Sequence, residues 1–229
     1  MPLSVLRAEV GKPQSWCDAM VLHYNIKAAT CQELGGQTVM TLYGGQKYYQ
    51  LPLKENALTG IFKVQDDRSG HFRAELVAPK GPFGSSNHRI EVEAVELPGN
   101  RSLVGLRYSY DYTVLARRAL EAYLKVESAN RVGLTVIGRD ASGRPQYVKG
   151  IRGAAERNGL RYYMALEAYL LNRDEPGESQ IFRRLNCWYN LNEAYPRQLH
   201  DLSREEYLNI KLREYRNQVS LQRRLSPSA

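Results

Sequence analysis

The chain has 229 residues and a mass of 26.1 kDa; 43% of its residues are hydrophobic, 24% are charged, and the net charge is +8. This length and balance are typical of a soluble globular protein with one domain, residues 1–229. The longest apolar run, Tyr162 to Leu171, is interrupted by Glu167 and is far shorter than the roughly 20 residues that a membrane-spanning helix needs, so no such helix is expected.

The excess of positive charge lies in the second half of the chain. Residues 1–100 hold 10 Lys and Arg against 10 Asp and Glu, whereas residues 101–229 hold 22 against 14. Most of these cations are arginines, whose planar guanidinium suits phosphate and carboxylate groups. The second half therefore suits transient contact with an anionic membrane surface, although solvated helix faces would give the same composition.

The compartment depends on the N-terminus and on the cysteines. Residues 1–10 lack both the basic and the apolar stretch of a signal peptide, which predicts a cytoplasmic protein, or a periplasmic or secreted one if a signal peptide was removed. Cys17 and Cys31 lie 14 positions apart, a spacing that allows a local disulfide and would then indicate export. The alternative is that both are buried thiols, since no cysteine has the spacing of a metal site.

The first half of the chain predicts one helix followed by a series of strands. The helix runs from Trp16 to about Tyr24, with Ser15 as its cap and Asp18 three residues later. Turn residues then separate segments in which apolar and polar residues alternate. The predicted strands are Thr38–Tyr43, Gln46–Leu51, Leu58–Gln65, His71–Ala78, His88–Leu97 and Leu103–Thr113.

The last of these strands has the clearest alternation. Leu106, Tyr108, Tyr110 and Tyr112 share one face because side chains along a strand point to opposite sides with a period of two. Consecutive strands without intervening helices form antiparallel meanders. The pattern therefore predicts an α+β protein with an antiparallel, curved sheet of six to eight strands and an aromatic inner face.

The second half of the chain is mainly helical by its spacing of apolar residues. From Val114 the period changes to about 3.6. A hairpin follows, since 133–138 and 146–149 flank a turn at 140–143, and then a long helix with an apolar stripe from Ile151 to Tyr169. The sheet is expected to grip this helix.

Two further helices are predicted between residues 178 and 225. The first has an apolar stripe from Ile181 to Leu191, and the second opens with a capping box at Ser203 and Glu206. The predicted buried side of the second helix consists of Leu208, Leu212, Tyr215 and Val219.

This order of elements resembles the helix-grip fold of the START-like (Bet v 1-like) lipid-transfer superfamily. The run Lys80–Ile90, the strand Leu106–Tyr110 and the pair Val136–Arg139 with Gly150–Gly153 look like those of an uncharacterised bacterial branch of that superfamily. The likeness covers about residues 12–172, the helix-grip core, and leaves 178–225 as a C-terminal helical extension. It implies non-catalytic binding or transfer of a hydrophobic ligand, lipid or sterol-like, with no cofactor.

Such a ligand would lie in a cavity between sheet and helix. Tyrosines suit its lining because each has a large apolar ring and a hydroxyl that can pair with a ligand oxygen. The same residues would also suit an ordinary core between sheet and helix. The predicted ligand-binding residues are Tyr108, Tyr110, Tyr112, Leu106, Phe62, Leu76, Tyr162, Leu166 and Tyr169.

Two other functions fit parts of the sequence. The alternative is an enzyme of the same fold, similar to a cyclase, an aromatase or a hydrolase, which could use Tyr110, Tyr112 and Arg161 as acid–base groups. No pattern in the sequence places these three side chains near one another. A nucleic-acid-binding module is disfavoured because the arginines are dispersed, and the GxxG at Gly150–Gly153 lacks the preceding helix of a KH domain. The scattered histidines predict no metal site.

Overall fold

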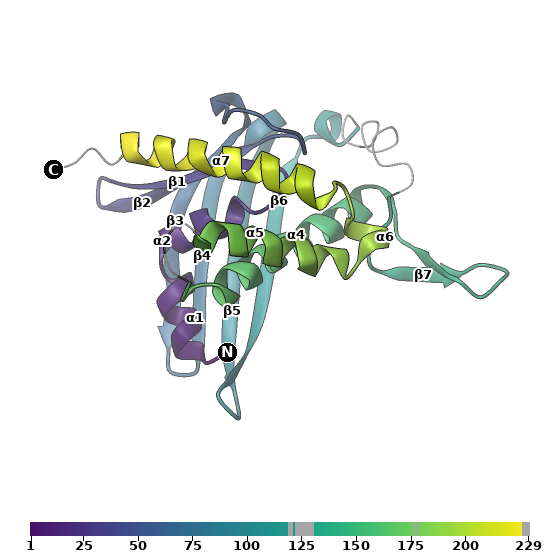
Figure 1. Cartoon of the computed structure of the whole chain (residues 1–229), viewed down its shortest axis with the longest axis horizontal. Coiled ribbons are helices and arrows are strands. Elements are labelled where there is room, and N and C mark those ends of the chain that lie inside the picture. The colour runs from purple at the N-terminus through teal and green to yellow at the C-terminus, as the bar shows by residue number, and fades with distance from the viewer. Residues whose placement is uncertain (119–120, 122–130, 176, 178, 226–229) are drawn as a thin grey trace.

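The protein is an α+β chain with a six-stranded antiparallel sheet, a separate two-stranded sheet and several helices (Figure 1). The computed structural model describes residues 1–118, 121, 131–175, 177 and 179–225. The helices lie over one face of the large sheet, and the two-stranded sheet projects from the body (Figure 1). In this part of the chain no helix is both long enough and apolar enough to cross a lipid bilayer.

The large sheet is a simple meander in which each strand pairs with the next along the chain. Five of the six predicted strands are confirmed, but Gln46–Leu51 is wrong, because this segment is an irregular loop in which the Gln50 side chain accepts from the Gln46 amide. The first strand is instead Ile26–Leu34. The strands are β1 (Ile26–Leu34), β2 (Gln37–Gly44), β3 (Ala57–Arg68), β4 (His71–Lys80), β5 (Ser85–Leu97) and β6 (Arg101–Tyr112).

Two short helices, α1 (Leu3–Val10) and α2 (Pro13–Met20), precede the sheet and cover its inner face. The predicted helix Trp16–Tyr24 is therefore wrong in its bounds. Pro13 begins α2 because its fixed φ suits the first helical position. Ser15 is not the cap but is buried, with its hydroxyl 2.8 Å from that of Tyr169.

The remaining helices stack beside the first two. They are α4 (Gly150–Leu171), α5 (Ser179–Glu193), α6 (Pro196–Leu199) and α7 (Arg204–Leu225). The helix α4 packs mainly on α2 and α5 and reaches the sheet at β6, so α1 and α2, not α4, fill most of the inner face. The helix predicted from Val114 is helical at 114–118, and 119–120 and 122–130 lie outside the described residues.

The capping box of α7 is confirmed, and its predicted buried side is confirmed in part. Ser203 and Glu206 bond each other's backbone amides. The four predicted residues are half-buried, and Leu208, Leu212 and Tyr215 pack against a hydrophobic cluster of α4, α5 and α7. The fully buried residues of the helix are Tyr207, Lys211, Glu214 and Gln218. The reason is that α7 lies along the free edge of β1, where its polar side chains bond backbone groups: the Ala29 amide donates to Gln218 and the Cys31 amide to Gln222. These bonds satisfy an edge strand that would otherwise be open to pairing.

The hairpin of β7 (Val136–Arg139) and β8 (Pro145–Tyr147) confirms the sequence prediction, and its base is fixed to α4. Gly133 packs against Gly153, and a Cβ on Gly133 would come within 2.8 Å of the Gly153 Cα. Gly153 thus has a structural role in close packing, which explains one glycine of the GxxG pattern. Glu156 completes the joint, because one of its carboxylate oxygens accepts from the amides of Leu134 and Thr135 at 2.7 and 2.9 Å.

The attachment of the β7–β8 hairpin to α4 through Glu156 is expected to weaken at low pH. Burial raises the pKa of Glu156, but hydrogen bonds from Thr135, Leu134 and Arg152 outweigh it and lower the pKa to about 2. Because the folded pKa lies below the reference value of 4.5, this stabilisation is complete above pH 4.5 and is lost as the pH falls towards 2. Glu156→Gln should therefore make the Leu134 and Thr135 amides exchange about tenfold faster at neutral pH.

Hydrogen exchange with residue resolution measures this effect, and Glu55→Gln, at an exposed acid far from the hairpin in sequence, is the control. Unchanged exchange at both amides in Glu156→Gln would contradict the assigned role.

Candidate ligand-binding site

The inner face of β6 carries a stack of tyrosines. Tyr108 and Tyr110 have ring centroids 5.2 Å apart, and those of Tyr110 and Tyr112 are 5.6 Å apart. Leu106 continues the row, opposite Val92 of β5. The alternation predicted from the sequence thus places all four side chains on the face that the helices cover.

His88 of β5 extends this stack and supports it. Its ring lies parallel to that of Tyr110, 5.1 Å away and at an interplanar angle of 4°. Gly81 makes room for it, since a Cβ there would lie 2.2 Å from the His88 Nε2. His88 is only 4% exposed, and this burial lowers its pKa, so the ring is neutral near pH 7.

The hydrogen bonds of His88 fix its tautomer. The Ser85 hydroxyl donates to the Pro82 carbonyl at 2.6 Å, so it accepts from the His88 Nε2–H at 2.8 Å. The Nδ1 atom then accepts from the Tyr108 hydroxyl at 3.0 Å. In this arrangement His88 donates to Ser85 and does not withdraw its proton, so the pair is not set up as a nucleophile and base.

The helix α4 contributes Tyr162 to the same cluster. The Tyr162 ring meets that of Tyr108 edge to face at 6.3 Å and stacks on His23 at 4.3 Å. Burial raises the pKa of Tyr162 to about 12 and holds the pKa of His23 well below its usual value, so both rings are neutral. His23 in turn contacts Trp188 of α5, so aromatic rings connect β6 with a second hydrophobic core. This second core consists of Leu22, Tyr24, Met164, Ala165, Ala168, Ile181, Leu185, Trp188, Tyr189, Leu199 and Tyr207.

We call the six residues of this cluster the aromatic seam: Leu106, Tyr108, Tyr110 and Tyr112 of β6, His88 of β5 and Tyr162 of α4. The seam is partly open. Tyr108 and Tyr112 are each 37% exposed, and Leu106, Tyr110 and Tyr162 are half-buried. Within the described residues, the hydroxyls of Tyr110 and Tyr112 have no hydrogen-bond partner, so both can donate to a ligand oxygen.

The other four predicted residues lie in the packed core, against which Leu106 and Tyr162 of the seam also pack. Phe62 and Leu76 project from the sheet and Leu166 and Tyr169 from α4, and none is more than 7% exposed. Phe62 meets the Trp16 ring edge-on at 5.4 Å. The structure therefore divides the predicted lining into a closed core and an open seam, and the alternative of an ordinary core applies to these four.

The sequence reasoning missed Phe83, beside the end of the seam. Phe83 is 83% exposed and has a φ of +56°, a left-handed conformation that is costly for an aromatic residue. It lies two residues before Ser85, which pairs with Tyr112. The signal available in the sequence was an aromatic residue inside the turn Gly81–Gly84, where small or polar residues are usual.

Arg161 does not join the tyrosines that it was predicted to accompany. Its side chain is 7% exposed, pairs with Asp201 and lies over the Tyr24 ring, so it belongs to the second core. The acid–base set predicted from the sequence is therefore not assembled. Across the described ranges, no group of three His, Cys, Asp or Glu side chains could hold a metal ion.

Cys17 and Cys31 lie next to each other between α2 and β1, and both are free thiols. The Cys17 thiol donates to the Cys31 sulfur, which raises the pKa of Cys17, together with burial, and lowers that of Cys31. Of the two alternatives that the sequence left open, the structure has the free thiols, and the two residues that a disulfide would join are adjacent.

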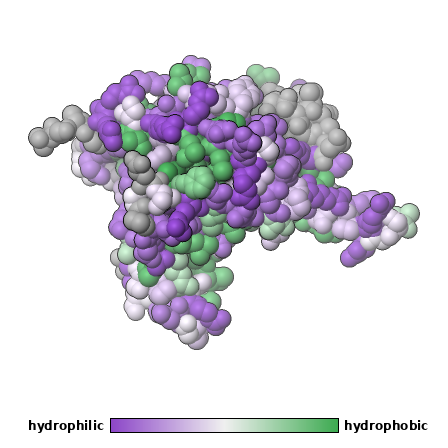
Figure 2. All heavy atoms as spheres, viewed as in Figure 1, coloured by the Kyte–Doolittle hydropathy of each residue, from purple (hydrophilic) through white to green (hydrophobic). Residues whose placement is uncertain are grey.

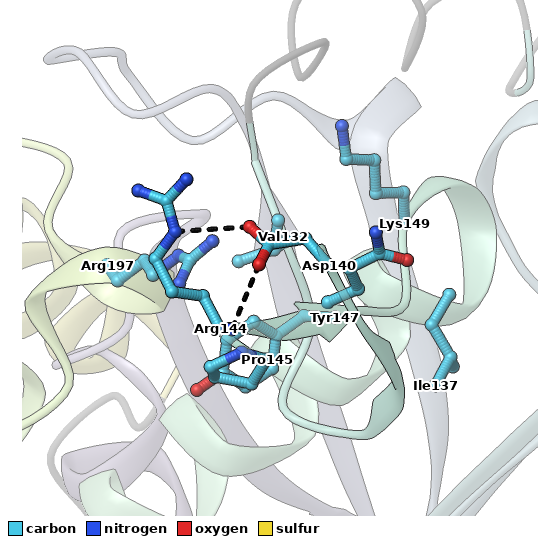
Figure 3. Close-up of a pocket in the computed structure, with 9 residues that line it drawn as sticks. Val132, Ile137, Asp140, Arg144, Pro145, Tyr147, Lys149 and Arg197 are labelled. Carbon is cyan, nitrogen blue, oxygen red and sulfur yellow. Dashed lines mark hydrogen bonds and ion pairs between the residues drawn. The ribbon is translucent and has the colours of Figure 1, made fainter. Parts of the chain in front are cut away.

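A surface hollow of about 760 Å³ lies beside the hairpin (Figure 3), and its lining includes no residue of the seam. It is lined by β7, β8 and α6, and it contains Arg144, Lys149 and Arg197 as well as Tyr147.

Comparison of the chain with protein-family models, with curated proteins and with solved structures finds no match in any of the three.

Proposed function

We propose that the protein binds a hydrophobic ligand, lipid or sterol-like, non-covalently on the aromatic seam. One observation carries the proposal: Tyr108, Tyr110 and Tyr112 form a stacked, half-exposed row that His88 supports from the neighbouring strand. Exposed aromatic surface in contact with water is unfavourable, and contiguous patches of it commonly mark binding sites. A ligand that covers the row would remove this surface from water.

The energies are sufficient for such binding. A ligand that removes roughly 400 Å² of apolar surface from water gains at most about 10 kcal/mol before the costs of association. The remaining surplus allows micromolar affinity. The free hydroxyls of Tyr110 and Tyr112 would select a ligand that has an oxygen beside its apolar body.

We also propose that the fold is a variant of the helix-grip arrangement. An antiparallel meander followed by a long helix that reaches its last strand supports this. This fold differs from the helix-grip arrangement because α1 and α2 occupy the inner face of the sheet. The ligand site therefore lies at the sheet edge formed by β6. Membership of the START-like superfamily stays a prediction from the sequence.

Tyr110→Ala should weaken ligand binding about tenfold, because it removes the central ring of the stack and its contacts on both sides. The chain is first purified and its extract analysed by mass spectrometry for a co-purifying hydrophobic molecule. Affinity is then measured by titration with a fluorescent fatty acid and a fluorescent sterol. Tyr110→Phe, which keeps the ring, should retain most of the affinity for the fatty acid.

Tyr48→Ala is the matched control, since Tyr48 is 52% exposed and has no ring contact with the seam. If wild-type protein carries no hydrophobic molecule and binds neither probe, the proposal is wrong. Equal losses in Tyr110→Ala and Tyr48→Ala would place binding elsewhere and would also contradict it.

A further inference from the structure

The β7–β8 hairpin extends from the body as a separate finger, in the ribbon (Figure 1) and in the space-filling view (Figure 2). Its base is fixed to α4 through Glu156, whereas its strands pair only with each other in the described structure. A rigidly anchored finger of this kind contributes little to the core. Its surface chemistry therefore indicates what it contacts.

The finger and its surroundings carry an excess of positive charge. Arg139, Arg144 and Lys149 lie on the hairpin and its continuation, and Arg197 of α6 lines the same hollow as Arg144 and Lys149. All four are exposed. Figure 3 shows Arg144 and Arg197 on one side of the hollow and Lys149 on the other.

One of these cations is neutralised locally. Asp140 lines the hollow, and its carboxylate pairs with the Arg144 side chain at 3.1 Å and accepts from the Ser142 hydroxyl. Arg197 stacks on the Tyr147 ring at 4.8 Å. Neither Arg197 nor Lys149 has an ion-pair partner in the part of the chain that the structure describes, so both can pair with external anions.

Exposed aliphatic side chains accompany these cations. Val136 is 50% exposed and Ile137 is 63% exposed, both on β7. Exposed aliphatic residues next to Lys and Arg are the composition of surfaces that enter the headgroup region of a bilayer, where cations meet phosphate and apolar groups reach the acyl chains. A nucleic-acid site would favour aromatic stacking on exposed rings over exposed aliphatics.

We infer that the β7–β8 hairpin docks on an anionic membrane surface. Lys149 and Arg197 pair with lipid phosphates, and Val136 and Ile137 enter the interface between headgroups and acyl chains. This docking site is separate from the aromatic seam and does not depend on the ligand proposed there. The sequence analysis expected the basic second half of the chain to contact an anionic membrane, and this inference assigns that contact to the hairpin.

The test is co-sedimentation of the full chain with vesicles. Binding is expected to mixed phosphatidylcholine and phosphatidylserine vesicles, to be much weaker with phosphatidylcholine alone, and to fall at high salt because surface charges are screened. Lys149→Gln with Arg197→Gln should lower the partition coefficient about 25-fold, from the contribution of each cation near the membrane. Ile137→Ser should lower it severalfold without changing the salt dependence.

The matched control is Lys54→Gln with Lys63→Gln, which removes the same charge from exposed sites outside the hairpin. The inference is wrong if wild-type protein fails to bind the anionic vesicles, or if the two double variants lose affinity equally. It is also wrong if the hairpin binds single-stranded oligonucleotides and leaves vesicles unbound. Ligand affinity at the seam should be unchanged in Lys149→Gln with Arg197→Gln, so failure here is distinct from failure of the ligand proposal.

Discussion

Glu214→Ala should lower the free energy of unfolding by about 3–5 kcal/mol, because it leaves two buried ammonium groups without their shared carboxylate. Glu214 lies on α7 and is fully buried. One of its oxygens accepts from Lys27 of β1 at 2.7 Å, and the other accepts from Lys211 of α7 at 2.5 Å. The three side chains join α7 to the first strand of the sheet.

The lysines also bond backbone carbonyls, which fixes their positions. The Lys27 ammonium donates to Tyr24 and Tyr48, and that of Lys211 donates to Ile26 and His23. Without Glu214 these bonds remain, but the two positive charges face each other in a site that water does not reach. Repulsion and desolvation then act together, which is why removal of one partner costs more than the pair contributes.

The loss should depend on pH in a defined direction. Burial lowers the pKa of Lys211 to about 8, and Glu214 opposes this shift by its charge. In Glu214→Ala the folded pKa of Lys211 falls further, while the unfolded chain still titrates near the reference value of 10.5. Between the lower folded pKa of the variant and about 8, only the folded variant has released this proton, so its stability rises with pH while that of wild type does not. The deficit of the variant therefore shrinks as the pH rises towards 8 and stays constant above it.

Urea unfolding at several pH values measures both effects. Glu205→Ala is the control, since Glu205 lies on the same helix and is exposed. Glu214→Gln, which keeps two polar atoms, should lie between wild type and Glu214→Ala. A loss below about 1 kcal/mol at neutral pH, the value typical of exposed pairs, would show that water enters this site and that the buried cluster is not a structural joint.

The sequence predicted elements whose environment follows a simple period. The strands from β2 to β6 and the helices α4 and α5 each have one face in the core and one in water, so apolar spacing identifies them. The strand β1 was missed because its first five residues are all buried and show no alternation. On α7 the spacing of apolar residues identified only the side that packs on the neighbouring helices, since the side chains that meet the sheet edge are Lys211, Glu214 and Gln218.

The candidate site, too, could be predicted only in the part that depends on local alternation. The alternation of β6 placed Leu106, Tyr108, Tyr110 and Tyr112 on one face, and the structure confirms that face. The sequence did not reveal which helices would cover it, because that choice depends on contacts between distant residues. The hydrogen bond between Ser15 and Tyr169 joins positions 154 apart and holds α2 against α4. No local pattern in the sequence predicts it.

Trp16→Ala should also lower the free energy of unfolding by about 3–5 kcal/mol, because it removes the largest side chain between α2 and the sheet. Trp16 is 2% exposed, contacts Phe62 edge-on and donates its indole N–H to the Val10 carbonyl at 2.8 Å. Deletion leaves a cavity and an unpaired carbonyl. Urea unfolding measures the loss, and Tyr48→Ala, at an exposed ring, should change stability by less than about 0.5 kcal/mol.

The same variant separates two possible locations of the ligand. If the ligand lies on the aromatic seam, folded Trp16→Ala should bind the fluorescent fatty acid with wild-type affinity, because the Trp16 ring meets that of Phe62 in the closed core and not a tyrosine of the seam. If the ligand instead lies between α2 and the sheet, the new cavity should change its affinity strongly. Tyr110→Ala should show the opposite pattern, a loss of affinity with little loss of stability, since Tyr110 lies in the half-open stack. Affinity that follows Trp16 and not Tyr110 would move the binding site from the sheet edge to the interior.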